Sequence, residues 1–250
     1  MVQFLATDGT KLFRADSTGA VFQGAVLSAA IQSLTVVPAG YNIAGLAAGD
    51  ILACAATATA GQYAIYRLND PFGAATLTQI GSTSVGIGSM VLANGNIYGV
   101  EDSLNPVRVY QLDSSNWSIS QTWNTGISAG GSGGLAWDDV NNRFLISDAT
   151  NNRLMSWGPG GTGTPVGPVG FSFTNNGMEF FNGTLYGALR PESAGNTLRL
   201  GSYDLTTGAF TTMATVTGVT GSGTGFVALP APGTLAVAVL GLVGSRRRRL

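Results

Sequence analysis

An internal repeat limits the fold of this chain more than any other feature. Three segments, 88–102, 133–148 and 176–189, share one order: glycine, a short apolar stretch, a polar turn and a second apolar stretch. Each is followed by a third stretch that mixes apolar and polar residues, and looser copies lie at 3–16 and 49–68. One large residue holds the same place in every copy, with spacings of 53, 44, 45 and 45 residues: Phe13, Tyr66, Tyr110, Met155 and Leu200.

A period in the mid-forties with about four short strands per unit is the sequence signature of a β-propeller blade. Apolar and polar residues alternate at or near period two in 107–113 and 143–148, as expected for strands. The 37 glycines, with abundant Asn, Ser and Thr, suit tight hairpin turns. We therefore predict an all-β propeller over residues 1–229, with about five blades, give or take one, of roughly 45 residues each.

The two ends of this domain complement each other. The N-terminal copy begins at what is the second strand of the other units, and 221–229 resembles the missing first strand, as comparison with 131–137 indicates. A first blade built from both chain ends would close the ring and cover its sheet edge. The sequence predicts this closure.

The stretch 134–154 carries a more specific pattern: Gly-apolar-Ala, a polar hairpin, an apolar strand ending in Ser-Asp, then Asn-Asn-Arg and another apolar strand. It resembles the repeats of NHL-type and related lactonase-like propellers. The resemblance is close for this unit and loose elsewhere. It implies a fold, whereas propellers include both binding modules and enzymes.

Acidic residues recur at the end of the second strand in three units, at Asp8, Glu101 and Asp148, whereas Ala55 and Leu189 stand there in the other two. Carboxylates that converge on one face could bind calcium or another cation, which makes these residues candidate metal ligands. Turn capping is the competing interpretation, and it is favoured because the ring would be incomplete. It is favoured also for the cluster 138–142, which lacks the spacing of an EF-hand loop.

Several activities are excluded or disfavoured by composition. The chain contains no histidine, so catalytic sites of the Ser-His-Asp and Cys-His types are excluded. Residues 1–229 carry a net charge of −5 and no basic stripe, which argues against nucleic-acid binding. Cys54 lies in an apolar stretch and is expected in the core. The four tryptophans, which could form a sugar-binding platform, are expected to pack in the core or between blades.

The C-terminus differs in kind from the rest. Residues 230–250 read PAPGTLAVAVLGLVGSRRRRL, with an apolar run over 234–245 and four arginines at 246–249. At about 1.5 Å per residue the run spans about 18 Å as a helix, short of the roughly 30 Å hydrocarbon layer. Arginines after an apolar run hold its end on the cytoplasmic side. We expect a short apolar helix that inserts into a membrane transiently.

The order of Pro motif, apolar run and Arg cluster resembles the PEP-CTERM protein-sorting domain. The resemblance covers 230–250 and implies recognition by an exosortase-like membrane protease at a bacterial cell envelope. Alanine stands where the family name has Glu, which leaves the subtype of the processing enzyme open, and a simple membrane anchor is the alternative. The matched residues are Pro230, Ala231, Pro232 and Gly233 in the motif and Arg246, Arg247, Arg248 and Arg249 in the cluster.

These features together predict an exported bacterial cell-surface or extracellular-matrix protein with a non-enzymatic binding or structural role. Its partner would be a polysaccharide or a protein, in a bacterium that makes exopolysaccharide. The alternative is a lactonase-like hydrolase with a channel-bound cation. Export requires a secretion signal, and none precedes the strand-like start at Met1. Our hypothesis is that the true start lies upstream.

Overall fold

The protein is all-β in the part of the chain that the structure describes. This computed structural model describes residues 1–41, 43, 45–59, 61–101, 105–127, 133–221 and 224–230. One 3-10 turn, Glu192–Ala194, is the helical element within these ranges. The strands of the first half are β1 (Val2–Thr7), β2 (Gly9–Asp16), β3 (Val21–Val36), β4 (Ile51–Ala56), β5 (Tyr63–Asn69), β6 (Thr76–Thr83), β7 (Ser89–Ala93), β8 (Asn96–Val100), β9 (Arg108–Leu112) and β10 (Ile119–Asn124). Those of the second half are β11 (Leu135–Asp138), β12 (Arg143–Asp148), β13 (Arg153–Trp157), β14 (Thr164–Pro168), β15 (Phe173–Phe181), β16 (Thr184–Pro191), β17 (Thr197–Tyr203), β18 (Phe210–Thr217) and β19 (Phe226–Pro230).

The described strands form antiparallel sheets in chain order. Three sheets have four strands each: β7 to β10, β11 to β14 and β15 to β18. The fourth has seven strands in the order β19-β1-β2-β3-β4-β5-β6. Its middle strand, β3, is 16 residues long and pairs with β2 mainly through its first half and with β4 through its second half. The five large residues that mark the repeat all lie in strands of equivalent position: β2, β5, β9, β13 and β17.

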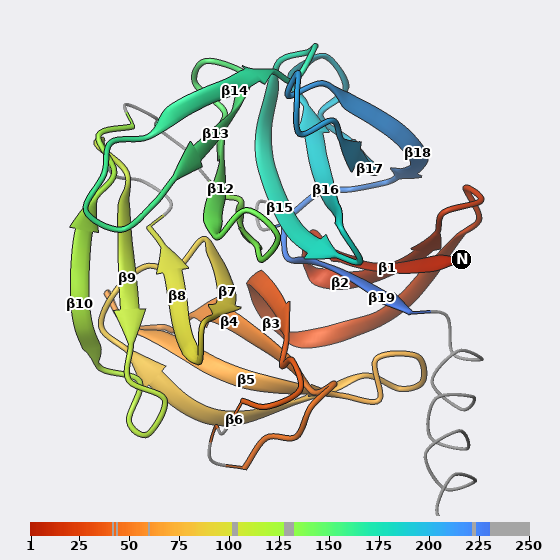
Figure 1. Cartoon of the computed structure of the whole chain (residues 1–250). Helices are drawn as coiled ribbons and strands as arrows, with labels where there is room; N and C mark the ends of the chain where they lie inside the picture. Colours follow the sequence, from red (N-terminus) through yellow and green to blue (C-terminus); the bar gives the residue numbers. More distant parts are fainter. Residues whose placement is uncertain are drawn as a thin grey trace, which may run out of the picture.

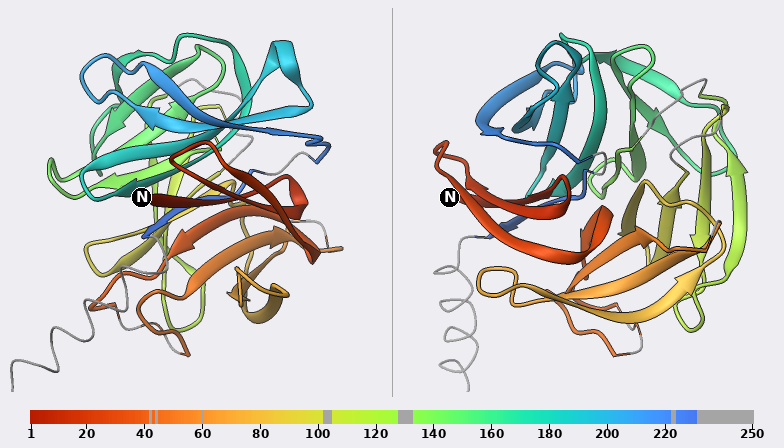
Figure 2. Two further views of the ribbon diagram at one scale, coloured as in Figure 1. Left: turned by 90° about the vertical axis from the view of Figure 1, so that its right-hand side faces the viewer. Right: turned by 180° about the vertical axis from the view of Figure 1, so that it is seen from behind.

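The sheets stand around a common axis, as Figures 1 and 2 show. Around this axis β19 contacts β3, β3 contacts β7, β7 contacts β11, β11 contacts β15 and β15 contacts β19. The strand order and this circular arrangement confirm the prediction of an all-β, propeller-like fold.

The two chain ends meet in the seven-stranded sheet. Strand β19 pairs antiparallel with β1, with Leu5 opposite Val227 and Val2 opposite Pro230. Beyond the strand, the Gly225 amide donates to the Thr7 hydroxyl at 2.9 Å, and the Thr220 amide donates to Asp8 Oδ2 at 2.9 Å. The predicted closure by 221–229 is therefore confirmed, and it covers the edge of β1 that would otherwise be open.

The core consists of apolar layers between neighbouring sheets. One layer packs Phe4 and Phe226 of the closure against Leu200 and Ala188 of β17 and β16. Cys54 is fully buried, and burial raises the pKa of its thiol to about 12, so the prediction of a core cysteine is confirmed. Trp117 and Trp157 are buried, and Trp123 and Trp137 pack against the same apolar clusters. The prediction that the tryptophans pack is thus confirmed.

The sorting motif falls mostly outside the described residues. Pro230 ends β19, whereas Ala231, Pro232, Gly233 and Arg246 to Arg249 lie beyond the described part of the chain. The boundary between 229 and 230 and the C-terminal helix therefore stay predictions. Within the described ranges no helix has the length and apolar character needed to cross a membrane.

Candidate functional site

The three candidate metal ligands are engaged in separate turns. Asp8 accepts from the Lys11 amide at 3.2 Å and from the Thr220 amide at 2.9 Å. Glu101 accepts a short hydrogen bond from the Tyr110 hydroxyl. Asp148 is fully buried and pairs with Arg153 Nε at 2.8 Å. Among the described residues, no group of three or more His, Cys, Asp or Glu side chains lies together as a metal site would require.

The turn of Asp148 repeats the geometry of another acidic turn ten residues earlier, that of Asp138. In each, a fully buried aspartate accepts from an amide three residues on, at 3.1 Å, and from an arginine Nε five residues on, at 2.8 to 2.9 Å. Asp138 pairs in this way with Arg143, and Asp148 with Arg153. Burial opposes ionisation of Asp138, but hydrogen bonds from Asn141 and Arg143 outweigh it and lower the pKa. These carboxylates therefore cap hairpins, as the competing interpretation held.

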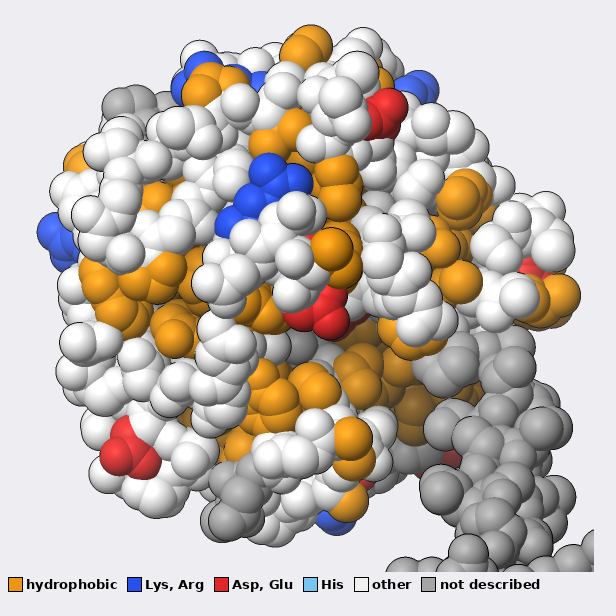
Figure 3. Space-filling model, viewed as in Figure 1, with side chains coloured by type: hydrophobic (Ala, Val, Ile, Leu, Met, Phe, Trp, Pro, Cys, Tyr) orange, Lys and Arg blue, Asp and Glu red, His pale blue; other side chains and the backbone are white. Residues whose placement is uncertain are grey.

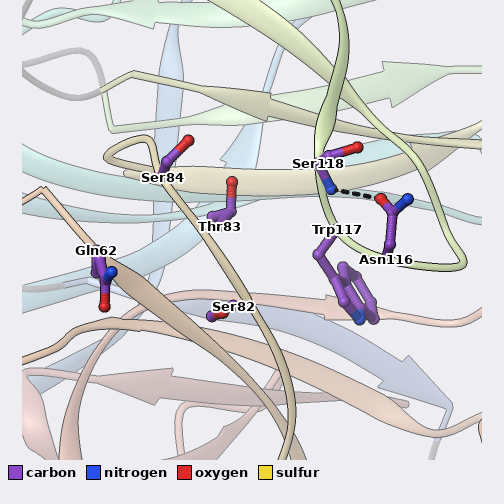
Figure 4. A pocket seen from close by; sticks show the side chains of 7 residues that line it. All are labelled: Gln62, Ser82, Thr83, Ser84, Asn116, Trp117 and Ser118. Atoms are coloured by element: carbon purple, nitrogen blue, oxygen red, sulfur yellow. Dashed lines mark hydrogen bonds between the residues drawn. The ribbon is translucent and has the colours of Figure 1, made fainter.

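A neutral pocket offers a better candidate site (Figure 4). It has a volume of about 250 Å³ and lies where the end of β6 faces the turn between β9 and β10. This is below the roughly 300–1,000 Å³ of typical clefts for drug-sized ligands, so the pocket suits one small ring. Its lining, called the polar pocket below, is Gln62, Ser82, Thr83, Ser84, Asn116, Trp117 and Ser118.

The turn between β9 and β10 is held by its own side chains. Asp113 Oδ1 accepts from the amide and the hydroxyl of Ser115, which is the main reason that its pKa is lowered. Asn116 Oδ1 accepts from the Ser118 amide at 2.9 Å, the bond drawn in Figure 4. The Trp117 amide donates to the Asp113 carbonyl at 2.8 Å. Five residues of one turn thus fix the pocket wall before any ligand binds.

Trp117 forms the floor of the polar pocket, and its side chain is 5% exposed. Its φ is 63°, in the left-handed region that a bulky residue rarely adopts. Its ring lies across β6 at Gly81, where an added Cβ would stand 2.1 Å from the indole Cδ1. The missing side chain at Gly81 therefore makes room for the indole.

The chemistry of the polar pocket is hydrogen bonding by uncharged groups. The seven lining residues include four hydroxyl side chains and two amides from three segments, and none of the seven ionises near neutral pH. The Thr83 hydroxyl is buried and has no hydrogen-bond partner in the described structure. Because buried polar groups are almost always paired, this hydroxyl indicates a position for a water or a ligand.

Two further hollows are less suited to a ligand. One of about 230 Å³ lies beside the polar pocket on the same hairpin and includes Asn96, Gln111 and Ser114. Asn96 Oδ1 already accepts from Gln111 Nε2 at 2.9 Å. The other, of about 270 Å³, is partly apolar and includes Phe22 and Phe72.

Sequence reasoning did not identify the polar pocket. Its residues come from three segments, around 62, 82–84 and 116–118, with ordinary turn and strand-end composition. Trp117 was considered as a sugar-binding residue, but its role as floor depends on Gly81, which lies 36 residues earlier in the sequence. The one local signal is a tryptophan inside a run of polar turn residues, Asp113-Ser-Ser-Asn-Trp-Ser.

Comparisons with known proteins concern the fold. No protein-family model matches the chain, and no curated protein does. A chain of a nidogen–laminin complex matches with a TM-score of 0.56 at 13% identity, covering 92% of this chain and 99% of that one. A luciferin-regenerating enzyme matches with a TM-score of 0.48 at 14% identity, covering 84% of this chain and 73% of that one. A 6-phosphogluconolactonase-like protein of Bacteroides uniformis matches with a TM-score of 0.43 at 14% identity, covering 86% of this chain and 67% of that one. Of these matches, the one with a TM-score above 0.5 supports the propeller-like fold of this chain, and at 13% identity it indicates nothing about a ligand.

Proposed function

We propose that the protein is a non-enzymatic binding protein whose polar pocket takes a neutral sugar unit of a polysaccharide. The observation that carries this proposal is the unpartnered Thr83 hydroxyl in a pocket lined by uncharged hydrogen-bonding side chains and one indole. A sugar ring offers hydroxyls that both donate and accept, which matches hydroxyl and amide groups better than an ionic ligand would. Turn hydrogen bonds hold the wall in place, which reduces the entropy lost on binding.

The test is a titration of neutral and anionic oligosaccharides, followed by calorimetry. We expect binding of neutral sugars and a loss of about fivefold to tenfold in affinity for Thr83→Val, the cost of one hydrogen bond. The same variant should keep or raise the free energy of unfolding, because it removes an unpaired buried hydroxyl. Ser114→Ala, in the neighbouring hollow, should leave binding unchanged. Equal binding by Thr83→Val and the parent chain would contradict the proposal.

Thermal unfolding with and without calcium distinguishes the binding proposal from the hydrolase alternative. Calcium added to the full chain should leave the Tm unchanged, since Asp8, Glu101 and Asp148 are engaged in separate turns. A calcium-dependent rise of the Tm would favour a cation site and the lactonase-like activity over simple binding.

We also propose that residues 230–250 address the protein to a bacterial cell envelope. The support is the order of motif, apolar run and arginines, together with the end of β19 at Pro230, directly before the run. An exosortase-like protease would act there, and the binding domain would then be held at the surface or released into the matrix. Cell fractionation of the full chain and of a chain with Arg246 to Arg249 replaced by serine tests this. Identical distribution of both would contradict it.

The finer architecture that we infer is five blades. Strand β3 would serve as the outer strand of the first blade and the inner strand of the second, and its pairing with both β2 and β4 supports this. The circle of contacts through β19, β3, β7, β11 and β15 supports one inner strand per blade. A crystal structure of the domain tests the count.

A further inference from the structure

An exposed apolar surface lies beside the point where the described chain ends. Phe22 at the start of β3 is 61% exposed, and Phe72 in the loop between β5 and β6 is 40% exposed. Phe22 and Phe72 border one hollow together with Gln3, Arg14 and Asp16. We call Phe22 and Phe72 the tail-side surface.

Arg14 fixes the position of the loop that carries Phe72 in the tail-side surface. Arg14 Nη2 donates to the Gly73 carbonyl at 3.0 Å, Nη1 donates to the Phe72 carbonyl, and the guanidinium lies 5.8 Å from the centre of the Phe72 ring. Asp70 supports the same loop by accepting from the Ala74 amide at 2.9 Å. The two phenylalanines are therefore presented to solvent by a fixed loop and a strand.

Strand pairing places this surface close to Pro230. Phe22 is opposite Arg14, Arg14 is opposite Leu5, and Leu5 is opposite Val227. At about 4.8 Å per strand, Phe22 lies about 14 Å across the sheet from β19. Pro230 is three residues further along β19. Figure 1 shows the end of β19, the N-terminus and the loop between β5 and β6 on the same side of the molecule, and Figure 3, in the same view, shows hydrophobic side chains exposed at several places on this face.

The length of the connection limits how far this surface can be from a membrane. Only Ala231, Pro232 and Gly233 separate Pro230 from the apolar run that begins at Thr234. Four residue steps of at most about 3.6 Å span about 14 Å. The interfacial layer on each side of the hydrocarbon is several ångströms thick, so a run inserted at Thr234 brings the end of β19 down to the lipid head groups.

We propose that the tail-side surface docks on the lipid bilayer, with Phe22 and Phe72 entering its interface, while the apolar run is inserted. This inference rests on the proposed membrane role of the tail. Exposed aromatic and aliphatic side chains on a fixed scaffold are typical of surfaces that enter the boundary between head groups and acyl chains. Docking would orient the propeller relative to the membrane and define which part of it faces outward.

The test uses the full chain and vesicles of phosphatidylethanolamine and phosphatidylglycerol. An environment-sensitive fluorophore is attached at Phe72→Cys and, as the matched control, at Val140→Cys. Val140 is 73% exposed in the turn between β11 and β12, in a different sheet. Cys54 is fully buried with a thiol pKa of about 12, so it stays unlabelled. Both labelled chains should float with the vesicles, and only the label at position 72 should shift to the blue and be quenched by lipids that carry a shallow nitroxide.

The outcomes separate the two proposals. Flotation with equal emission at positions 72 and 140 overturns the docking surface and leaves the membrane role of the tail intact. Failure to float overturns both. A blue shift at position 72 without vesicles also overturns lipid docking: dependence on protein concentration would identify a second copy as the occupant, and independence would identify the chain's own tail. A second variant, Phe22→Ser with Phe72→Ser, should lower partitioning into vesicles severalfold without changing the Tm.

Discussion

At the residue scale, the main feature is the carboxyl group of Glu179, which has a buried oxygen without a partner among the described residues. Glu179 on β15 lies opposite Tyr186 of β16, whose ring packs 5.4 Å from that of Phe4 in the closing sheet. Its Oε2 atom is buried and has no hydrogen-bond partner in the described structure. Burial raises the pKa of this carboxyl to about 8. The folded protein therefore keeps a proton at neutral pH that the unfolded chain has lost.

The replacement Glu179→Gln tests this at the residue scale. In the parent chain the free energy of unfolding should fall as pH rises from about 4.5, the ordinary value, to about 8, because only the unfolded state has released the proton over that window. The glutamine variant should lack this fall and be more stable than the parent at pH 9, because it carries no charge to bury. Urea unfolding at pH 5 and pH 9 measures the difference. Glu192→Gln, at an exposed site, is the control, and a parent chain with equal stability at both pH values would contradict the prediction.

At the scale of elements, two hairpins are capped by buried carboxylates, those of Asp138 and Asp148. Asp138 is fully buried and pairs with Arg143, whereas its neighbour Asp139 is exposed in the same turn. Asp138→Ala should lower the free energy of unfolding by about 3–5 kcal/mol, because it breaks a buried pair and leaves amide donors unpaired. Asp139→Ala should change it by less than about 0.5 kcal/mol. Chemical denaturation of the two variants makes the comparison, and similar losses would show that the carboxylate is not the cap.

The positions of the strands could be predicted from the sequence, whereas the contacts of their side chains could not. The repeat located β2, β5, β9, β13 and β17 because strand alternation and turn residues are local signals. The similar acidic positions Asp8, Glu101 and Asp148 suggested one ring, yet each side chain bonds to different partners. A repeat places equivalent backbones equivalently, but it does not specify where a side chain points. The polar pocket was missed for the same reason, because its walls come from different hairpins.

At the scale of the whole molecule, closure by β19 should decide whether the domain folds. Deleting 224–250 removes the strand that pairs with β1 and leaves Phe4 and Leu5 without their neighbours Phe226 and Val227. We expect this deletion to abolish the cooperative thermal transition, whereas deleting only 231–250 should retain it. Circular dichroism during heating and limited proteolysis measure both. Matching transitions in the two truncated chains would show that closure is dispensable.

The sequence by itself determined the strand content, the repeat of the mid-forties, the joining of both ends in one sheet and the different character of 230–250. These properties follow from patterns along the chain, because alternation, turn residues and apolar runs act between near neighbours. Only the tertiary structure decided that Asp8, Glu101 and Asp148 form no common site, that Trp117 lies on Gly81 in a pocket shared with an unpartnered Thr83, and that Phe22 and Phe72 border one hollow. Such arrangements depend on which strands lie side by side after the ring closes, and residues far apart in sequence carry no local signal of that contact.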